Sequence, residues 1–135
     1  MLGEILAEER GKITGTRVLP SDGHGPKLEV SFQASGKLQG VDATDMGTYV
    51  AVLTSDGTLF GEGQGVIMTA DGGVVGWRGQ GVGRPTGQGM GAHWRGAIYY
   101  QTTSQKFAHL NSVVAIFEYE VDGEGNTESR AWEWK

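Results

Sequence analysis

Four polar side chains on one face of a glycine-rich hairpin are the first candidates for chemistry in this sequence. A carboxylate, a guanidinium and two amides in one place can hold a polar or anionic small molecule. An arginine buried there would need a carboxylate or an anionic ligand, because an unpaired buried charge costs several kcal/mol. The four residues lie within the stretch 58–84 and are Glu62, Gln64, Arg78 and Gln80.

The turn of this hairpin sets which side chains share a face. A three-residue loop at Ala70-Asp71-Gly72 pairs Thr69 with Gly73 and places the four polar residues together. A two-residue turn at Asp71-Gly72 would slip the register by one residue and separate the two polar pairs. The form of the loop favours the first register.

The opposite face of the hairpin carries six glycines, which are unusual in strands because glycine contributes no packing. If the strands close into a barrel and the polar face points inward, the barrel encloses a polar pocket. If the glycine face points inward, the missing side chains leave room for a ligand beside Trp77. In a third, purely structural interpretation, the glycines let the strands coil or let Trp94 or Tyr100 pack on bare backbone. The glycines are Gly61, Gly63, Gly65, Gly79, Gly81 and Gly83.

A second polar set follows in the stretch 93–102 and in a later strand. His93, Arg95, Tyr99 and Gln101 share one parity, and Glu118 and Glu120 form an i, i+2 pair. If these side chains point inward, they could join the hairpin residues as an acid, a base and an anion holder. The alternative is an ordinary solvated face.

Cysteine and histidine usage argues against metal and cofactor sites. The chain has no cysteine, so thiolate ligands and nucleophiles are excluded. His24, His93 and His109 have no metal-ligand spacing. No GxGxxG, GxxxxGK[ST] or GxSxG motif occurs, so phosphate loops and a serine nucleophile are not predicted. We expect no cofactor and no metal, and we assign no catalytic residue.

Composition indicates one globular domain. The 135 residues carry a net charge of −5 without a basic cluster, which argues against nucleic-acid binding. No apolar run is long enough for a membrane helix. The first residues, MLGEILAEERGK, lack the apolar region of a signal peptide, so we expect a cytoplasmic protein.

Alternating apolar residues predict an all-β fold. Leu28, Val30, Phe32 and Ala34, for example, share one face of a strand. Residues 40–47 read as an irregular connection, and the first strand could instead be a helix up to Arg10. Eight long antiparallel strands favour closure into a barrel, with an open sandwich as the alternative. The predicted strands are 3–18, 27–39, 48–54, the two of 58–84, 93–102, 112–121 and 128–135, with a helical turn at 104–111.

Several segments together resemble a family of small uncharacterised bacterial proteins with an allene-oxide-cyclase-like barrel. These segments are GEGQGV (61–66), GQGVGR (79–84), WRGAIYYQT (94–102), FEYEVD (117–122) and WEWK (132–135). The resemblance runs from about Leu28 to the end of the chain. It implies a closed eight-stranded antiparallel barrel and a homo-oligomer. It implies no cyclase activity, because no catalytic position of the plant cyclases is matched.

The leading hypothesis from the sequence is a barrel that binds a small molecule in a polar and aromatic lumen. The candidate ligand-binding residues are Glu62, Gln64, Arg78, Gln80, His93, Arg95, Tyr99 and Glu118. The first alternative is an isomerase or cyclase in which Glu62 or Glu118 is the base and Arg78 or Arg95 holds negative charge. The second is a structural oligomer subunit with a filled barrel, with Trp132 and Trp134 packing on the barrel or on a neighbouring subunit.

Overall fold

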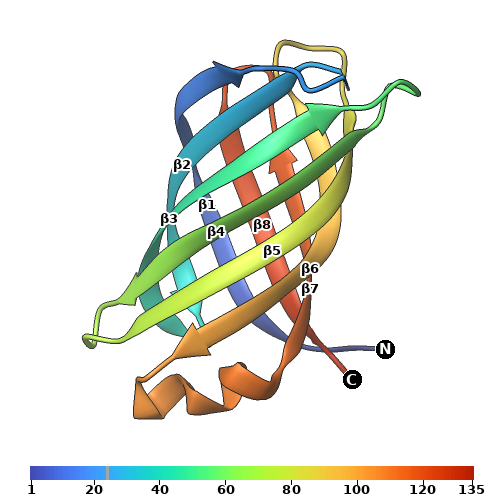
Figure 1. The fold of residues 1–135 in the computed structure, drawn as a ribbon. Coiled ribbons are helices and arrows are strands. Elements are labelled where there is room, and N and C mark those ends of the chain that lie inside the picture. The colour runs from blue at the N-terminus through green and yellow to red at the C-terminus, as the bar shows by residue number, and fades with distance from the viewer. Residues whose placement is uncertain (24) are drawn as a thin grey trace.

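The computed structural model describes residues 1–23 and 25–135, which form one closed antiparallel barrel of eight strands (Figure 1). Each strand pairs with the next along the chain, and the last pairs with the first. The barrel prediction is therefore confirmed, and the open sandwich is not formed. The elements are β1 (Leu2–Leu19), β2 (Lys27–Leu38), β3 (Val41–Leu53), β4 (Leu59–Thr69), β5 (Val74–Pro85), β6 (Ala92–Thr102), the 3₁₀ helix η1 (Gln105–Ser112), β7 (Val114–Val121) and β8 (Asn126–Trp134).

The start of β3 differs from the sequence prediction. Residues 41–47 are paired strand, where an irregular connection was predicted. A turn at Gln39 and Gly40 joins β2 to β3, and both residues have positive φ, 48° and 80°. This is the backbone pattern of a two-residue turn whose twist matches the strands on either side. Glutamine rarely adopts positive φ, so no residue type in this stretch indicated the turn.

The first strand is extended throughout, without the alternative helix, but its alternation is interrupted. Its pairing with β8 shifts register on both sides of Ile5. As a result Leu6 is buried and Ile5 is 41% exposed, although the sequence placed Ile5 on the same face as Ala7. From Ala7 onward the inward parity runs through Glu9.

Backbone geometry confirms the predicted loop at Ala70-Asp71-Gly72 and the similar Ser55-Asp56-Gly57 loop, whose sequence predicts the same three-residue form. Gly57 and Gly72 have φ of 86° and 90°, the left-handed conformation that favours glycine. The Thr69 amide donates to the Gly73 carbonyl over 2.9 Å, which closes the three-residue loop. The register of β4 and β5 is therefore the one predicted from this loop.

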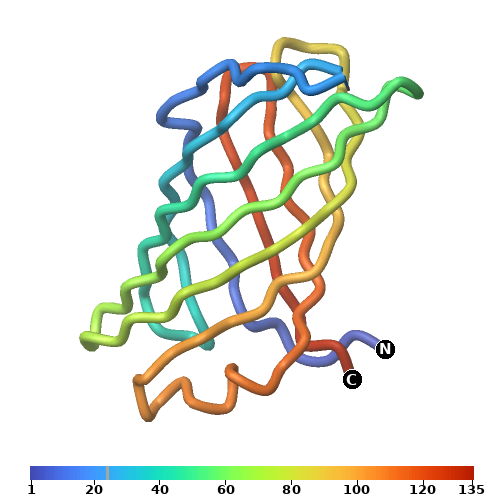
Figure 2. Tube along the Cα trace, in the orientation of Figure 1, coloured from blue at the N-terminus to red at the C-terminus, as the bar shows by residue number. Residues whose placement is uncertain are grey.

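One end of the barrel is covered by η1, which lies below β6 in Figures 1 and 2. Its Phe107 and Leu110 are buried and pack with Leu38, Val75 and Tyr100. The predicted helical turn is confirmed, but the side chain of Ser104 makes no capping hydrogen bond. A second apolar cluster, which includes Trp94 and Tyr119, fills the lumen separately. No helix within the described residues is long and apolar enough to cross a membrane.

Candidate ligand site in the barrel lumen

The glycine face of the 58–84 hairpin points into the barrel. Ile67, Val75 and Gly81 on this face are buried, whereas Glu62, Gln64, Arg78 and Gln80 on the other face are exposed. Of the two pocket orientations left open by the sequence, the structure has the second. The missing side chains of the glycines leave space on this inner face.

The indole of Trp77 occupies part of this space, because it lies over glycines of the two neighbouring strands. Trp77 on β5 pairs with Gly65 on β4, and Gly65 pairs with Gly47 on β3. A Cβ added at Gly65 would lie 2.4 Å from the indole, and one at Gly47 would lie 2.6 Å from it. Such contacts are impossible for real side chains, so both positions require glycine while Trp77 keeps this orientation.

Trp94 repeats the same arrangement one strand further along. It pairs on β6 with Gly83 of β5, and its ring also reaches Gly61 of β4. A Cβ at either glycine would approach the ring to 2.8 Å. The structural interpretation of the glycines, with Trp94 packed on bare backbone, is therefore confirmed for this residue.

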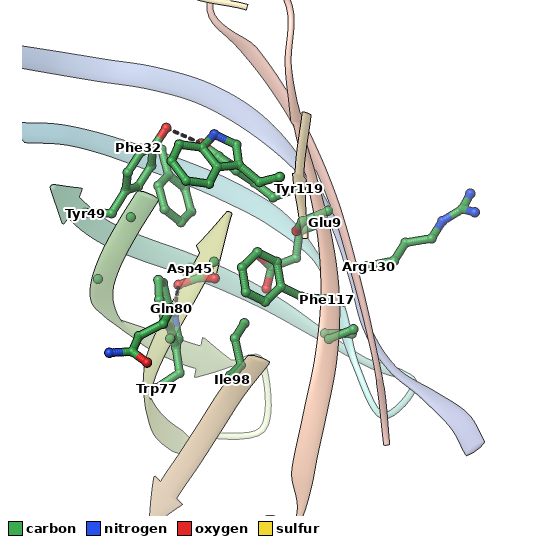
Figure 3. Close-up of a pocket in the computed structure, with 18 of the residues that line it drawn as sticks. Glu9, Phe32, Asp45, Tyr49, Trp77, Gln80, Ile98, Phe117, Tyr119 and Arg130 are labelled. Atoms are coloured by element: carbon green, nitrogen blue, oxygen red, sulfur yellow. Dashed lines mark hydrogen bonds between the residues drawn. The ribbon is translucent and has the colours of Figure 1, made fainter. Parts of the chain in front are cut away.

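Between the two indoles the lumen holds a cavity of about 90 Å³ (Figure 3). One wall is bare backbone of β4 and β5 at Gly63, Gly79 and Gly81. Ile98 and Phe117 close the side of β6 and β7. The glycines thus serve both purposes considered from the sequence, because they seat the indoles and leave unfilled space beside Trp77.

Aromatic rings line much of the rest of the cavity. Phe32 stacks against Trp77 with ring centroids 6.2 Å apart and contacts Tyr119 at 5.6 Å. Tyr49 meets Tyr119 edge to face at 5.6 Å and Trp94 at 5.8 Å. The two tyrosine hydroxyls lie 3.3 Å apart within hydrogen-bonding reach. These mutual contacts hold the rings in fixed orientations around the space.

Two carboxyl groups, those of Glu9 and Asp45, share this aromatic interior. They come from β1 and β3, on either side of β2, and they are 6% and 5% exposed. Between them β2 contributes Ala34, which pairs with Asp45, and Gly36, which pairs with Glu9. Because these two residues are small, the carboxyls meet across β2 and form a side-chain hydrogen bond.

The environment of the pair keeps one proton on it at neutral pH. Burial raises the pKa of the Glu9 carboxyl to about 9, and the nearby Asp45 charge and hydrogen bond add to the rise. Burial also raises the pKa of Asp45, but hydrogen bonds from Glu9 and from the Trp77 indole favour its ionised form. Glu9 is therefore the protonated donor and Asp45 the acceptor of a pair that titrates as a unit.

Tyr100 adds a polar atom to the same cavity. This tyrosine is 6% exposed and lines the cavity. Burial, together with the charges of Glu9 and Asp45, raises the pKa of its hydroxyl. Tyr49 and Tyr119 bond to each other, but no residue in the described part of the chain hydrogen-bonds to the Tyr100 hydroxyl. Because no fully buried side-chain polar atom of the described residues lacks a partner, this hydroxyl is not fully buried. Its hydrogen-bonding capacity is thus free inside the lumen.

The site residues predicted from the sequence lie together, but on the outer surface. Glu62 pairs with Gln80 and Gln64 with Arg78, and the Gln80 amide donates to Glu62 over 3.0 Å. In Figure 3 the Gln80 side chain points away from the cavity that its backbone lines. These four residues face outward because the indoles of Trp77 and Trp94 occupy the inner face.

The second predicted set also lies outside, beside the first. Arg95 bonds Glu120 at 2.9 Å and approaches Glu118 at 3.5 Å, and His93 contacts Glu120. Tyr99 is 53% exposed and pairs with Arg78. The condition under which this set would join a lumen site is not met. A role in binding stays a prediction for the outer surface of β4 to β7, and His24 lies outside the described residues.

Sequence reasoning missed Glu9, Asp45 and Tyr100. The sequence contains a signal for Glu9 and Asp45, because each is a charged residue among small or apolar residues at alternate positions of its strand. Glu9 follows Ala7 on the inward face, and Asp45 lies between Ala43 and Gly47. Asp45 was overlooked because residues 40–47 were not assigned to a strand.

The two lumen carboxyls are too few to form a metal site by themselves. Within the described residues no group of three or more histidine, aspartate or glutamate side chains could hold a metal ion. A second hollow of about 360 Å³ crosses the outer face of β1. Its charges are neutralised in pairs, Arg10 with Glu128 at 3.4 Å and Arg130 with Glu8 at 3.7 Å. The lumen is therefore the stronger candidate.

Comparisons with known proteins support the fold. No protein-family model and no curated protein matches the chain. A Clostridium acetobutylicum protein of unknown function aligns with a TM-score of 0.84 and 11% identity over 98% of both chains. An Acinetobacter baumannii β-barrel-like protein aligns at 0.83 and 15% over 98% of this chain and 94% of its own. A Penicillium herquei protein described as an enzyme aligns at 0.65 and 19%, over 96% and 92%. At these identities the likeness establishes a shared barrel and nothing about activity.

Proposed function

We propose that the protein binds a small molecule inside the barrel, between the indoles of Trp77 and Trp94. The observation that carries the proposal is an unfilled aromatic cavity with a proton-sharing carboxyl pair in its wall. Ligand sites combine apolar walls with a few convergent polar groups in this way. A barrel built only for stability would gain by filling this space, because empty volume in a core is costly.

The size of the cavity limits the ligand. An engineered cavity of about 150 Å³ in another protein admits benzene. The present 90 Å³ therefore suits a molecule smaller than benzene, or one group of a larger ligand. Glu9 donates its proton to Asp45, so the groups left for a ligand are the carboxylate oxygens of Asp45 and the hydroxyl of Tyr100.

Filling the cavity tests the proposal. Ile98→Phe enlarges a side chain that lines the space, and we expect it to abolish binding while preserving the fold. Binding is measured by NMR with a library of fragments smaller than benzene, following the indole N–H resonances. Val82→Phe is the matched control, because Val82 is on the outer face and 61% exposed. An absence of shifts in the wild type, or equal shifts in the Ile98→Phe variant, would refute the proposal.

A second candidate function is a proton-transferring isomerase or cyclase in the same cavity. It is favoured by the carboxyl pair, since a neutral acid beside a carboxylate can give and take protons. The residues carrying this role are Glu9 and Asp45 instead of Glu62 or Glu118. The Arg130 side chain points away from the cavity (Figure 3), so the charge-holding arginine of the original hypothesis has no counterpart here. Solvent deuterium entering a bound ligand, and lost in Asp45→Asn, would establish this candidate.

Three further proposals rest on the sequence. The allene-oxide-cyclase-like family fits a closed barrel of eight strands. A cytoplasmic location stays a proposal. A homo-oligomer is supported by apolar side chains on the outside of β8 and β1, where Trp134 is 55% exposed and Leu2 is 50% exposed.

A further inference from the structure

The lumen contains a buried carboxyl pair, Glu9 and Asp45, without a basic partner. Asp45 accepts bonds from the Trp77 indole at 2.8 Å and from Glu9, both of which are neutral donors. No ion pair in the described part of the chain includes Glu9 or Asp45. A buried charge is strongly destabilising unless something compensates it.

The basic side chains of the protein lie elsewhere. Of the eleven lysines and arginines, ten are exposed, and Lys27 is half-buried at the start of β2, where it bonds Asp22. His93 and His109 are exposed as well. Arg130 lines the cavity, but its side chain points away from it (Figure 3) and lies 3.7 Å from Glu8. Within the described residues no cationic side chain forms an ion pair with Glu9 or Asp45.

Two more features of the cavity suit a positive charge. The rings of Phe32, Trp77 and Tyr119 line it, and aromatic faces attract cations. Tyr100 as a residue is 94% buried, and its hydroxyl has no described hydrogen-bond partner and lies near both carboxyls. Its oxygen can accept a hydrogen bond from an N–H group. The carboxylate, the phenol oxygen and the rings thus surround one small space.

We propose that the lumen ligand is a small organic cation, an ammonium or guanidinium group, held by Asp45, Tyr100 and the aromatic rings. This inference rests on the proposed binding function and narrows it to a class of ligand. The cation donates N–H bonds to Asp45 and to the Tyr100 oxygen. Glu9 stays beside Asp45 as a proton donor, or gives up its proton when the cation approaches. Binding therefore strengthens as the pH rises from 6 to 9.

The groups that face the pair come from several strands. On β6 the Tyr100 hydroxyl feels both charges, and on β7 the Tyr119 hydroxyl feels Asp45. On β5 the Trp77 indole donates to Asp45. The two tyrosines stay neutral across this range because their pKa values are raised. The pH dependence of binding therefore reports on Glu9 and Asp45.

A pair of isosteric probes tests the inference. Methylguanidinium and N-methylurea are planar and nearly equal in size, and they differ in charge. We expect methylguanidinium to bind at least about tenfold more tightly, since the Asp45 carboxylate and the aromatic faces both favour a cation over a neutral molecule of the same shape. Binding is followed by NMR at the Trp77 indole N–H, with sodium chloride at the same ionic strength as a blank.

Variants locate the charge. Asp45→Asn keeps the shape and removes the charge, and we expect it to bring the two affinities to about the same value. Tyr100→Phe removes one oxygen, and we expect weaker methylguanidinium binding without loss of the fold. It keeps the test informative if Asp45→Asn does not fold. Glu8→Gln, on the outer face near Arg130, is the matched control and leaves both affinities unchanged.

The outcomes separate this inference from the binding function on which it rests. If N-methylurea bound as tightly as methylguanidinium, or if fragments bound and methylguanidinium did not, the proposal of a cationic ligand would be refuted. The proposal of a binding pocket in the lumen would stand. If neither probe and no fragment bound to the wild type, both the cationic ligand and the binding function would be refuted. Methylguanidinium binding that persists in Asp45→Asn would place the cation elsewhere and contradict the assignment.

Discussion

The indole Nε1–H of Trp77 donates to Oδ1 of Asp45 over 2.8 Å inside the barrel (Figure 3). The ring reaches this oxygen from β5 because Gly65 and Gly47 leave both intervening positions bare. One hydrogen bond thus connects the glycine pattern of the hairpin to the carboxyl pair of the lumen. It also fixes the orientation of the acceptor oxygen.

Removing this bond should destabilise the protein measurably. Trp77→Phe keeps an aromatic ring but leaves Asp45 one donor short and a gap over the two glycines. Hydrogen bonds to charged groups contribute about 1.5–3 kcal/mol, and the gap adds to this, so we expect a loss of about 2–4 kcal/mol. Urea unfolding measures it.

Trp134→Phe provides the matched control for this substitution. Trp134 is 55% exposed on the outer face, so we expect a change within about 0.5 kcal/mol. Equal losses at the two positions would mean that the bond to Asp45 contributes nothing specific.

Stability should fall as the pH rises through neutrality. The pKa of Glu9 is raised from 4.5 to about 9, so between these values the folded protein keeps a proton that the unfolded chain releases. The stabilisation of the folded protein by the proton on Glu9 is fully present below pH 4.5 and is lost as the pH rises through 9. Asp45 shifts in the same direction and adds to the slope. We expect up to about 1.4 kcal/mol per pH unit from Glu9, measured by urea unfolding at pH 5 to 9.

Glu9→Gln should flatten this profile, because the amide is neutral at every pH. The slope contributed by Asp45 remains. Glu8→Gln is the control, since the neighbouring Glu8 lies on the outer face near Arg130 and should leave the slope intact. A wild-type profile that rises with pH between 6 and 9 would show that Glu9 is ionised in the folded protein.

The sequence identified the barrel because its signals are local. Alternation in Leu28–Ala34 and glycine in two Asp-Gly loops depend on neighbouring residues, and both were confirmed. The site depends on contacts across the barrel that no local pattern encodes. Glu9 and Asp45 are 36 positions apart and meet only because β2 carries Ala34 and Gly36 between them. The charged residues that the sequence does group together, Glu62 and Arg78, share a face because of the hairpin register, and that face is exposed to solvent.

A homo-oligomer should use the apolar stripe outside β8 and β1. In this stripe Trp132 pairs with both Ile5 and Ile116, and Trp134 pairs with Leu2. We expect Trp134→Glu, combined with Ile5→Glu, to lower the mass measured by light scattering to that of one chain. Val82→Glu, at an exposed position on β5, should leave the assembly unchanged. A wild type that is already monomeric at 100 µM by the same measurement, about a typical upper working concentration, would exclude an oligomer of useful affinity.

The requirement for glycine beneath the Trp77 indole, at Gly65 and Gly47, can be tested by adding a single methyl group. Gly65→Ala would place a Cβ 2.4 Å from the indole, so the ring must move and its bond to Asp45 must break or bend. We expect a loss of about 1–3 kcal/mol, as for other overpacked cores, together with a shifted Trp77 indole N–H resonance. Gly76→Ala is the matched control one strand away, where the nearest atom would be 3.6 Å from the new Cβ. It should leave both the stability and the resonance nearly unchanged. If Gly65→Ala were equally harmless, the glycines would have to be explained by strand coiling alone.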